Sequence, residues 1–189
     1  EMLRSLVGSE MCIRDRSKIR ENTKNSTNSG HSFLAKLFHW SFVFLFVYGI
    51  YKQIDNINEL EDIYLLKSEM LFALVFLLFL IFRFFYMTKT QKTSLPVDAP
   101  KSQRLVSKIV HVSMYICLAG IAGSGMMIGY LFWLGFNAGP LIELAIQIHE
   151  SLVSLTYWLV SIHVIAAIFH RLRGDGVWNS MVPFWKEND

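Results

Sequence analysis

Cysteine is scarce in this chain, which has only Cys12 and Cys117 among its 189 residues. The two lie in unrelated contexts and show no paired spacing, so the sequence supports neither a disulfide framework nor a thiolate metal site. Cys117 is expected to be a small apolar packing residue. The sequence also lacks an apparent internal repeat and a concentrated basic patch, so no nucleic-acid partner is expected.

Apolar residues are abundant instead. They make up 53% of the chain, and the mean hydropathy of +0.37 is too high for an ordinary soluble domain. A helix needs about 20 mostly apolar residues to cross a bilayer, and a sheet with open edges finds no hydrogen-bond partners in lipid. We therefore predict an all-α, integral membrane four-helix bundle with spans at Phe33–Tyr51, Ile63–Met87, Leu105–Gly135 and Leu141–Leu172.

Basic residues in the connections predict the orientation of the spans. The connection between the first two spans is acidic, and the one between the last two has no charge. Lysine and arginine lie before the first span, between the second and third, and after the fourth: Lys18, Arg20, Lys24, Lys89, Lys92, Lys101, Arg104, Arg171, Arg173 and Lys186. We predict an up-down-up-down bundle with both termini in the cytoplasm, and the net charge of +3 reflects this topology.

The chain divides into four parts by composition. Residues 1–16 resemble a translated sequencing-adapter string and have neither the apolar core nor the cleavage site of a signal peptide, so we expect them to be an artefact. Residues 17–32 are polar and suit a flexible cytoplasmic lead. Residues 33–183 form the predicted membrane domain, and residues 184–189 are a tail.

Four histidines fall inside the predicted spans, where an ionisable side chain is costly and usually faces the bundle interior for a functional reason. His39, His111 and His163 each lie a few residues from the cytoplasmic end of their span. His149 precedes His163 by fourteen positions, which places it on nearly the same helix face but roughly 21 Å away along the axis. We expect three imidazoles in the inner layer of the bundle and one in the outer layer.

Two imidazoles from different helices are a usual way to hold a haem iron in a bundle core. A haem between the first and fourth spans would join His39 to His163, which would be its metal ligands. The alternative for this pair is an interhelical hydrogen bond without a cofactor. For His111 a hydrogen bond to a haem propionate, a quinone contact or a plain helix contact is favoured over a ligand role.

Several segments of the sequence point to one family. They are KLFHW in the first span, HVSMYICLAGIAGSGMM in the third, HESLVSLTYWLVSIHVIAAIFH in the fourth and GDGVWNSMVP after it. Over about residues 33–183 the chain resembles the bacterial cytochrome b561 family, which is related to the cytochrome b subunits of nickel-iron hydrogenases. The resemblance implies a multi-pass protein of the bacterial inner membrane that carries two b haems and exchanges electrons with ubiquinone or another quinone. It further implies that His39 and His163 hold the inner haem and that His149 is one ligand of the outer haem.

The second span departs from the family pattern. The family supplies the other ligand of the outer haem from a histidine there, often just before Lys-Ser, but here Leu66 precedes Lys67-Ser68 and the span has no histidine. Alignment on the basic residue Arg83 puts Glu69 at the ligand position instead. One haem b is therefore expected. Three alternatives stay open for the second haem. In the first it is absent, and His149 is hydrogen-bonded to a group such as Glu69. In the others it is held by His149 alone, or by His149 together with Glu69, Met126 or Met127.

The weaker candidates are basic and aromatic residues. Lys36, Arg83, Lys108, Arg171 and Arg173 form a predicted inner basic rim that would neutralise haem propionates or attract an anionic substrate, or that simply follows the positive-inside rule. We expect the quinone to approach the inner haem beside this rim. The phenylalanines of the second span are expected to face lipid.

Two alternative functions stay open at this stage. The chain could be the membrane anchor and electron-transfer subunit of a dehydrogenase or hydrogenase, with a redox partner protein. It could also be a haem-free bundle whose histidines form a proton or metal-ion path.

Overall fold

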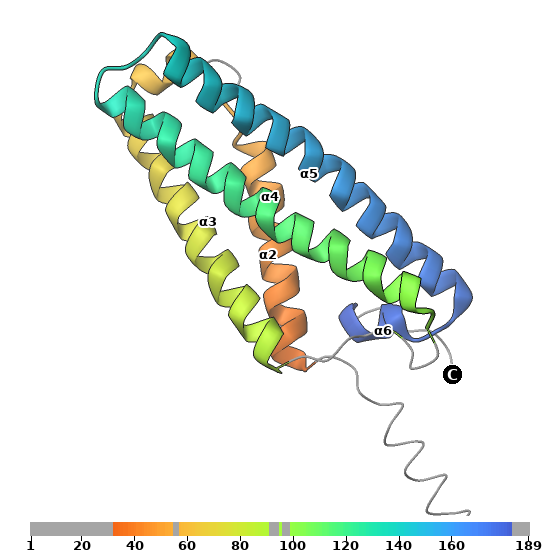
Figure 1. The fold of residues 1–189 in the computed structure, drawn as a ribbon. Coiled ribbons are helices and arrows are strands. Elements are labelled where there is room, and N and C mark those ends of the chain that lie inside the picture. Colours follow the sequence, from red (N-terminus) through yellow and green to blue (C-terminus); the bar gives the residue numbers. More distant parts are fainter. Residues whose placement is uncertain (1–31, 55–56, 91–94, 96–98, 183–189) are drawn as a thin grey trace, which may run out of the picture.

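The computed structural model describes residues 32–54, 57–90, 95 and 99–182. The predicted artefact at residues 1–16, most of the polar lead at 17–32 and the tail at 184–189 lie outside the described residues. The described part is all-α, as predicted, and four of its helices are long and apolar enough to cross a membrane. The elements in chain order are α2 (Phe33–Tyr51), the 3-10 helix η1 (Ile57–Glu61), α3 (Ile63–Thr90), α4 (Lys101–Trp133), α5 (Pro140–Arg173) and α6 (Val177–Met181) (Figure 1).

The four long helices run antiparallel in chain order. The start of α2 meets the end of α3, where Ser32 Oγ lies 3.3 Å from Tyr86 Oη. The start of α4 meets the end of α5, where Gln103 Nε2 lies 3.3 Å from His170 Nε2. One end of the bundle therefore carries α6 and the other carries η1 (Figure 1). We call these the α6 end and the η1 end.

Glycine and proline set the limits of α5. Gly139 has a φ of +113°, a backbone conformation that side chains disfavour, and Pro140 then begins the helix at a position where its missing N–H costs nothing. At the other end Gly174 has a φ of +63° and donates its N–H to Arg171 O. This left-handed residue stops the helix and turns the chain toward α6.

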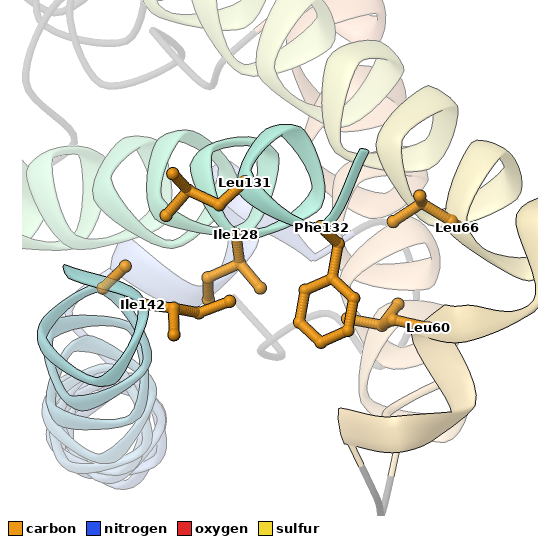
Figure 2. Close-up of a cluster of buried hydrophobic side chains, with 7 residues drawn as sticks. Leu60, Leu66, Ile128, Leu131, Phe132 and Ile142 are labelled. Carbon is orange, nitrogen blue, oxygen red and sulfur yellow. The ribbon is translucent and has the colours of Figure 1, made fainter. Parts of the chain in front are cut away.

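Buried apolar residues form two clusters in the bundle. The one at the η1 end joins η1 and α3 to α4 and α5 (Figure 2), and comprises Leu60, Leu66, Ile128, Leu131, Phe132, Ile142 and Ala145. The other joins α2, α3 and α4, and comprises Phe42, Phe76, Leu80, Leu118 and Ala122. Most other apolar side chains face outward, as expected where lipid is the solvent.

The phenylalanines of α3 do not all face lipid, so that prediction was wrong for half of the run. Phe76 is buried, and Phe72 and Phe79 pack against the same cluster. Phe82, Phe84 and Phe85 are exposed. Phe76 also lies against the ring of Phe42, with 5.1 Å between the two centroids, because α2 packs on this face of α3.

Helix α2 stands apart from two of the other long helices. Within the described residues no Cα atom of α2 comes within 8 Å of a Cα atom in α4 or α5, whereas α3 and α6 both pack against it. Lys36 Nζ donates to Asn179 O at 2.7 Å, and Trp40 Nε1 donates to Met181 O at 3.2 Å. Helix α6 also packs against α5, so it bridges α2 and α5 at one end of the bundle.

Candidate functional site

Three histidines from three helices meet near the α6 end. His39 on α2 and His163 on α5 have ring centroids 6.5 Å apart, across the space that separates these two helices. His111 on α4 lies edge-on to His163, with 5.0 Å between the centroids. The structure thus brings together the three histidines that the sequence assigns to one layer.

The ring nitrogens of these histidines differ in their partners. His111 Nδ1 lies 2.7 Å from Ser107 O, and it must donate because a carbonyl only accepts. His163 has no hydrogen-bond partner among the described residues although its side chain is partly buried. A histidine that is held inside a bundle without a partner is available as a ligand.

Arg83 on α3 lies beside the same histidines. Its Nη2 is 2.8 Å from His39 Nδ1 and its Nη1 donates to Tyr115 Oη at 2.9 Å. Its Nε is buried without a partner, and no carboxylate of the described residues lies within 4 Å of the guanidinium. A buried cation without a counter-charge is unfavourable, so this position suits an anionic group.

This histidine cluster is not a bare metal site. No group of three or more His, Cys, Asp or Glu side chains in the described part of the chain has the arrangement that holds a metal ion. Two imidazoles can nevertheless provide the axial ligands of a metal that brings its other ligands with it. The cluster therefore suits a metal complex with anionic substituents.

His149 occupies the other half of α5 and has different surroundings. Its Nδ1 lies 2.9 Å from Ser124 Oγ on α4, and a Cβ atom added at Gly125 would lie 3.4 Å from its Cε1. Glycine at this position lets the imidazole lie close to the α4 backbone. Within the described residues the hydrogen bond from His149 to Glu69 that the sequence suggested is not formed, and Glu69 Oε1 lies against Lys52 instead.

A cavity of about 350 Å³ adjoins His149 at the η1 end. Residues from α2, η1, α3, α4 and α5 line it, and most of them are apolar. Among the proposed alternative ligands Glu69 lines this cavity, whereas Met126 and Met127 are not part of the lining.

Glu69 is engaged by a neighbouring cation. Its Oε1 lies 2.7 Å from Lys52 Nζ at the end of α2, and Lys52 also donates to Ser68 Oγ at 3.0 Å. Leu66, the residue before Lys67-Ser68, belongs to the buried cluster at the η1 end. The described part of α3 therefore brings a carboxylate, and no imidazole, to the cavity.

The residues of the predicted inner basic rim have different positions in the structure. Lys36 donates to α6, and the guanidinium of Arg171 lies 4.8 Å from the Trp178 ring of α6, so both help to hold this helix. Arg83 instead points into the bundle. Tyr115 and Ser124, which orient Arg83 and His149, were missed by sequence reasoning, since hydroxyl groups are common in membrane helices and their spacing gives no signal of a partner.

The fold and these two sites define a helical membrane protein with a cluster of imidazoles at one end of its interior and a single imidazole at the other. The chain belongs to the prokaryotic cytochrome b561 family, whose model matches residues 30–184. It is therefore a multi-pass membrane cytochrome of electron transport that binds b-type haem. No curated protein and no solved structure matches the chain.

Proposed function

We propose that His39 and His163 hold one b haem at the α6 end and that this site exchanges electrons with the quinone pool. The observation that carries the proposal is the 6.5 Å between the two ring centroids. Two opposed metal–nitrogen bonds of about 2 Å each would separate the ring centres by roughly 6 Å. The His111 and His163 rings, 5.0 Å apart and edge-on, are too close for a metal between them.

The charge at this site also supports a haem. Haem b carries two propionates, and Arg83 presents a partly buried guanidinium whose Nε has no acceptor. An arginine pairs with a carboxylate through two parallel N–H groups, and such charge-assisted hydrogen bonds are stronger than neutral ones. Arg83 would therefore bind a propionate and neutralise its charge inside the bundle.

Binding of the haem requires a proton to change its place on His39. Arginine only donates, so in the observed contact His39 Nδ1 accepts from Arg83 and Nε2 carries the proton. Ligation through Nε2 needs the other tautomer, with the proton on Nδ1. Arg83 would then have to leave His39 Nδ1, which would free its N–H groups for a propionate.

Two imidazole ligands would leave a haem iron no open position, which would favour electron transfer over oxygen binding. When bound, the haem supplies a carrier for one electron at a time. Quinone is the lipid-soluble partner in this proposal. The basic residues at the helix ends favour a cytoplasmic location for the α6 end, in the bacterial inner membrane.

Haem quantitation tests the proposal. We expect one haem per chain by pyridine haemochrome, with a low-spin b-type α-band in the reduced-minus-oxidised spectrum. His39→Leu should lose this haem, whereas the control His111→Gln should keep it with an unchanged spectrum. A colourless protein, or a full low-spin spectrum in His39→Leu, would overturn the assignment. Copurification of a flavin or iron-sulfur protein would indicate an anchor subunit instead.

A further inference from the structure

Helix α6 lies at the end of the bundle where the three histidines meet (Figure 1). It packs against both α2 and α5, although in the described residues no Cα atom of α2 comes within 8 Å of a Cα atom of α5. The other connection between these two helices runs through α3 and α4, across three successive helix interfaces. Small shifts at each interface add up along that route. Helix α6 therefore connects directly the two helices that carry His39 and His163.

Two side chains of α2 attach it to α6. Lys36 Nζ donates to Asn179 O at 2.7 Å, and Trp40 Nε1 donates to Met181 O at 3.2 Å. Lys36 and Trp40 are four positions apart and so lie on one face of α2, and Trp40 follows His39 in the chain. Both acceptors are among the last four carbonyls of α6, which have no partner within an α-helix. The two donors thus complete α6 and attach it beside His39.

His170 and Asp175 attach α6 to α5. A carboxylate only accepts, so His170 Nδ1 donates to Asp175 Oδ2, 2.6 Å away. The other side of the ring is held from α4, where Gln103 Nε2 lies 3.3 Å from His170 Nε2. Asp175 Oδ1 accepts from Val177 N, the first residue of α6, at 3.3 Å. The His170 and Asp175 side chains are only 12% and 19% exposed, so water competes little for their hydrogen bond.

The linker between α5 and α6 does not define the direction of α6 without this contact. Asp175 lies between Gly174 and Gly176, which have φ values of +63° and +79°. Glycine admits many backbone conformations, and no heavy atom lies within 4 Å of a Cβ built on either residue. Packing around the two glycines therefore leaves the linker unconstrained, and the Asp175 carboxylate supplies the constraint.

We propose that α6 is a strap that holds α2 and α5 at the spacing of the His39 and His163 rings, and that His170 and Asp175 are the positioning residues that anchor it. The inference rests on the proposed function, since the 6.5 Å between these rings matters only if both bind one iron. With the strap attached, α2 is held at its distance from α5 and both ligands stay in reach of the metal. Neither His170 nor Asp175 touches the cofactor site in this proposal.

Transfer of haem from the purified, haem-loaded chain to excess apomyoglobin tests the anchor. Asp175→Ala removes the acceptors of two hydrogen bonds, so we expect haem release to become about tenfold faster. Asp175→Asn keeps an acceptor of the same size and should restore most of the wild-type rate. Asp62→Ala is the matched control, because Asp62 Oδ1 accepts from Tyr64 N in the same way at the start of α3, at the η1 end. It should leave the release rate unchanged.

The electron paramagnetic resonance spectrum of the ferric protein gives a second readout. Its low-spin g values depend on how the two axial imidazoles are oriented, which a general loss of stability does not change. Trp40→Phe keeps the ring but loses the donor to Met181 O, so we expect shifted g values and about fivefold faster release. Trp133→Phe is the control, since this exposed residue ends α4 at the η1 end, and it should change neither quantity.

The outcomes separate the strap from the haem assignment. Wild-type release and wild-type g values in Asp175→Ala and Trp40→Phe would overturn the strap, while loss of haem in His39→Leu would leave the proposed function intact. Equal acceleration of release in Asp62→Ala and Asp175→Ala would also overturn it, because the effect would then be a general loss of stability. Full haem in His39→Leu would instead overturn the proposed function, whatever the α6 variants show.

Discussion

The two ends of this bundle carry the same residue type in different electrostatic settings. At the α6 end, His39 and His163 approach each other across the space between α2 and α5, and the neighbouring cation Arg83 has no carboxylate partner. At the η1 end, His149 has a hydroxyl partner, and the neighbouring cation Lys52 is already paired with Glu69. The first end thus combines two facing imidazoles with a cation that has no counter-charge, whereas the second combines one imidazole with a cation that is already paired. A histidine in a membrane helix is thus not by itself a haem ligand, because the partner on the facing helix and the nearby charge decide what it binds.

The largest expected difference between the two ends is in haem content. His163→Leu removes one of the two proposed haem ligands, so we expect haem per chain to fall to less than about a tenth of the wild-type value. His149→Leu should leave it within about a fifth of the wild type. Pyridine haemochrome against protein mass measures both. Equal losses in the two variants would contradict the distinction between the ends.

The second prediction is that one substitution gives the η1 end two imidazoles, as the α6 end has. Glu69→His places an imidazole on the cavity wall contributed by α3, and we expect the haem content to rise from one to two per chain. Leu66→His is the comparison variant, because Leu66 also lines the cavity but is packed in the buried cluster and only 4% exposed, which leaves less room for an imidazole. If Leu66→His gained haem and Glu69→His did not, the family register of Lys67-Ser68 would define the ligand position instead.

The third prediction concerns the unpaired charge. A unit charge about 8 Å from the iron, at an effective dielectric constant of about 20, contributes about 2 kcal/mol, which is about 90 mV for one electron. Because a nearby cation favours the reduced haem, Arg83→Gln should lower the reduction potential by up to this amount, and Arg83→Lys should restore most of it. Lys52→Gln serves as the control, with a much smaller shift in a spectroscopic redox titration. A potential that is unchanged in Arg83→Gln would place Arg83 away from the haem.

The smallest effect is expected at the ion pair of the η1 end. Lys52→Met leaves the carboxylate of Glu69 without its cation, and since both side chains are 24% exposed we expect a loss of about 1 kcal/mol in the free energy of unfolding. Adding Glu69→Gln should recover most of that loss. A double-mutant cycle in mixed micelles titrated with SDS gives the coupling energy. Additive effects of the two changes would mean that the pair contributes nothing.

The sequence predicted the spans better than it predicted which way their side chains point. The first span matches α2 residue for residue, whereas α3 continues past Met87 to Thr90 and α4 begins at Lys101, because charged residues extend a helix beyond its apolar run. Counting along the spans brought His39, His111 and His163 into one layer. The burial of Phe76 was missed, since lipid and protein interior are equally apolar and the sequence pattern does not separate them.

The sequence also did not reveal which partners the charged and polar side chains contact. Arg83 was grouped with the rim because only its position along the helix was known, and its contacts with His39 and Tyr115 depend on how α2 and α4 pack around α3. The pairing of Glu69 with Lys52 depends in the same way on where α2 ends. Such contacts join residues far apart in the chain, and no local spacing encodes them.

The separation of α2 from α5 also bears on how the protein is made. His39 lies in the first of the four long helices to leave the ribosome and His163 in the last, so under the proposed ligation the site stays incomplete until α5 has entered the membrane. Because the backbones of α2 and α5 are already apart, these residues could receive a haem sideways between the two helices, without passage through a closed bundle. Uptake of the haem would therefore report that synthesis has reached the last of the four long helices.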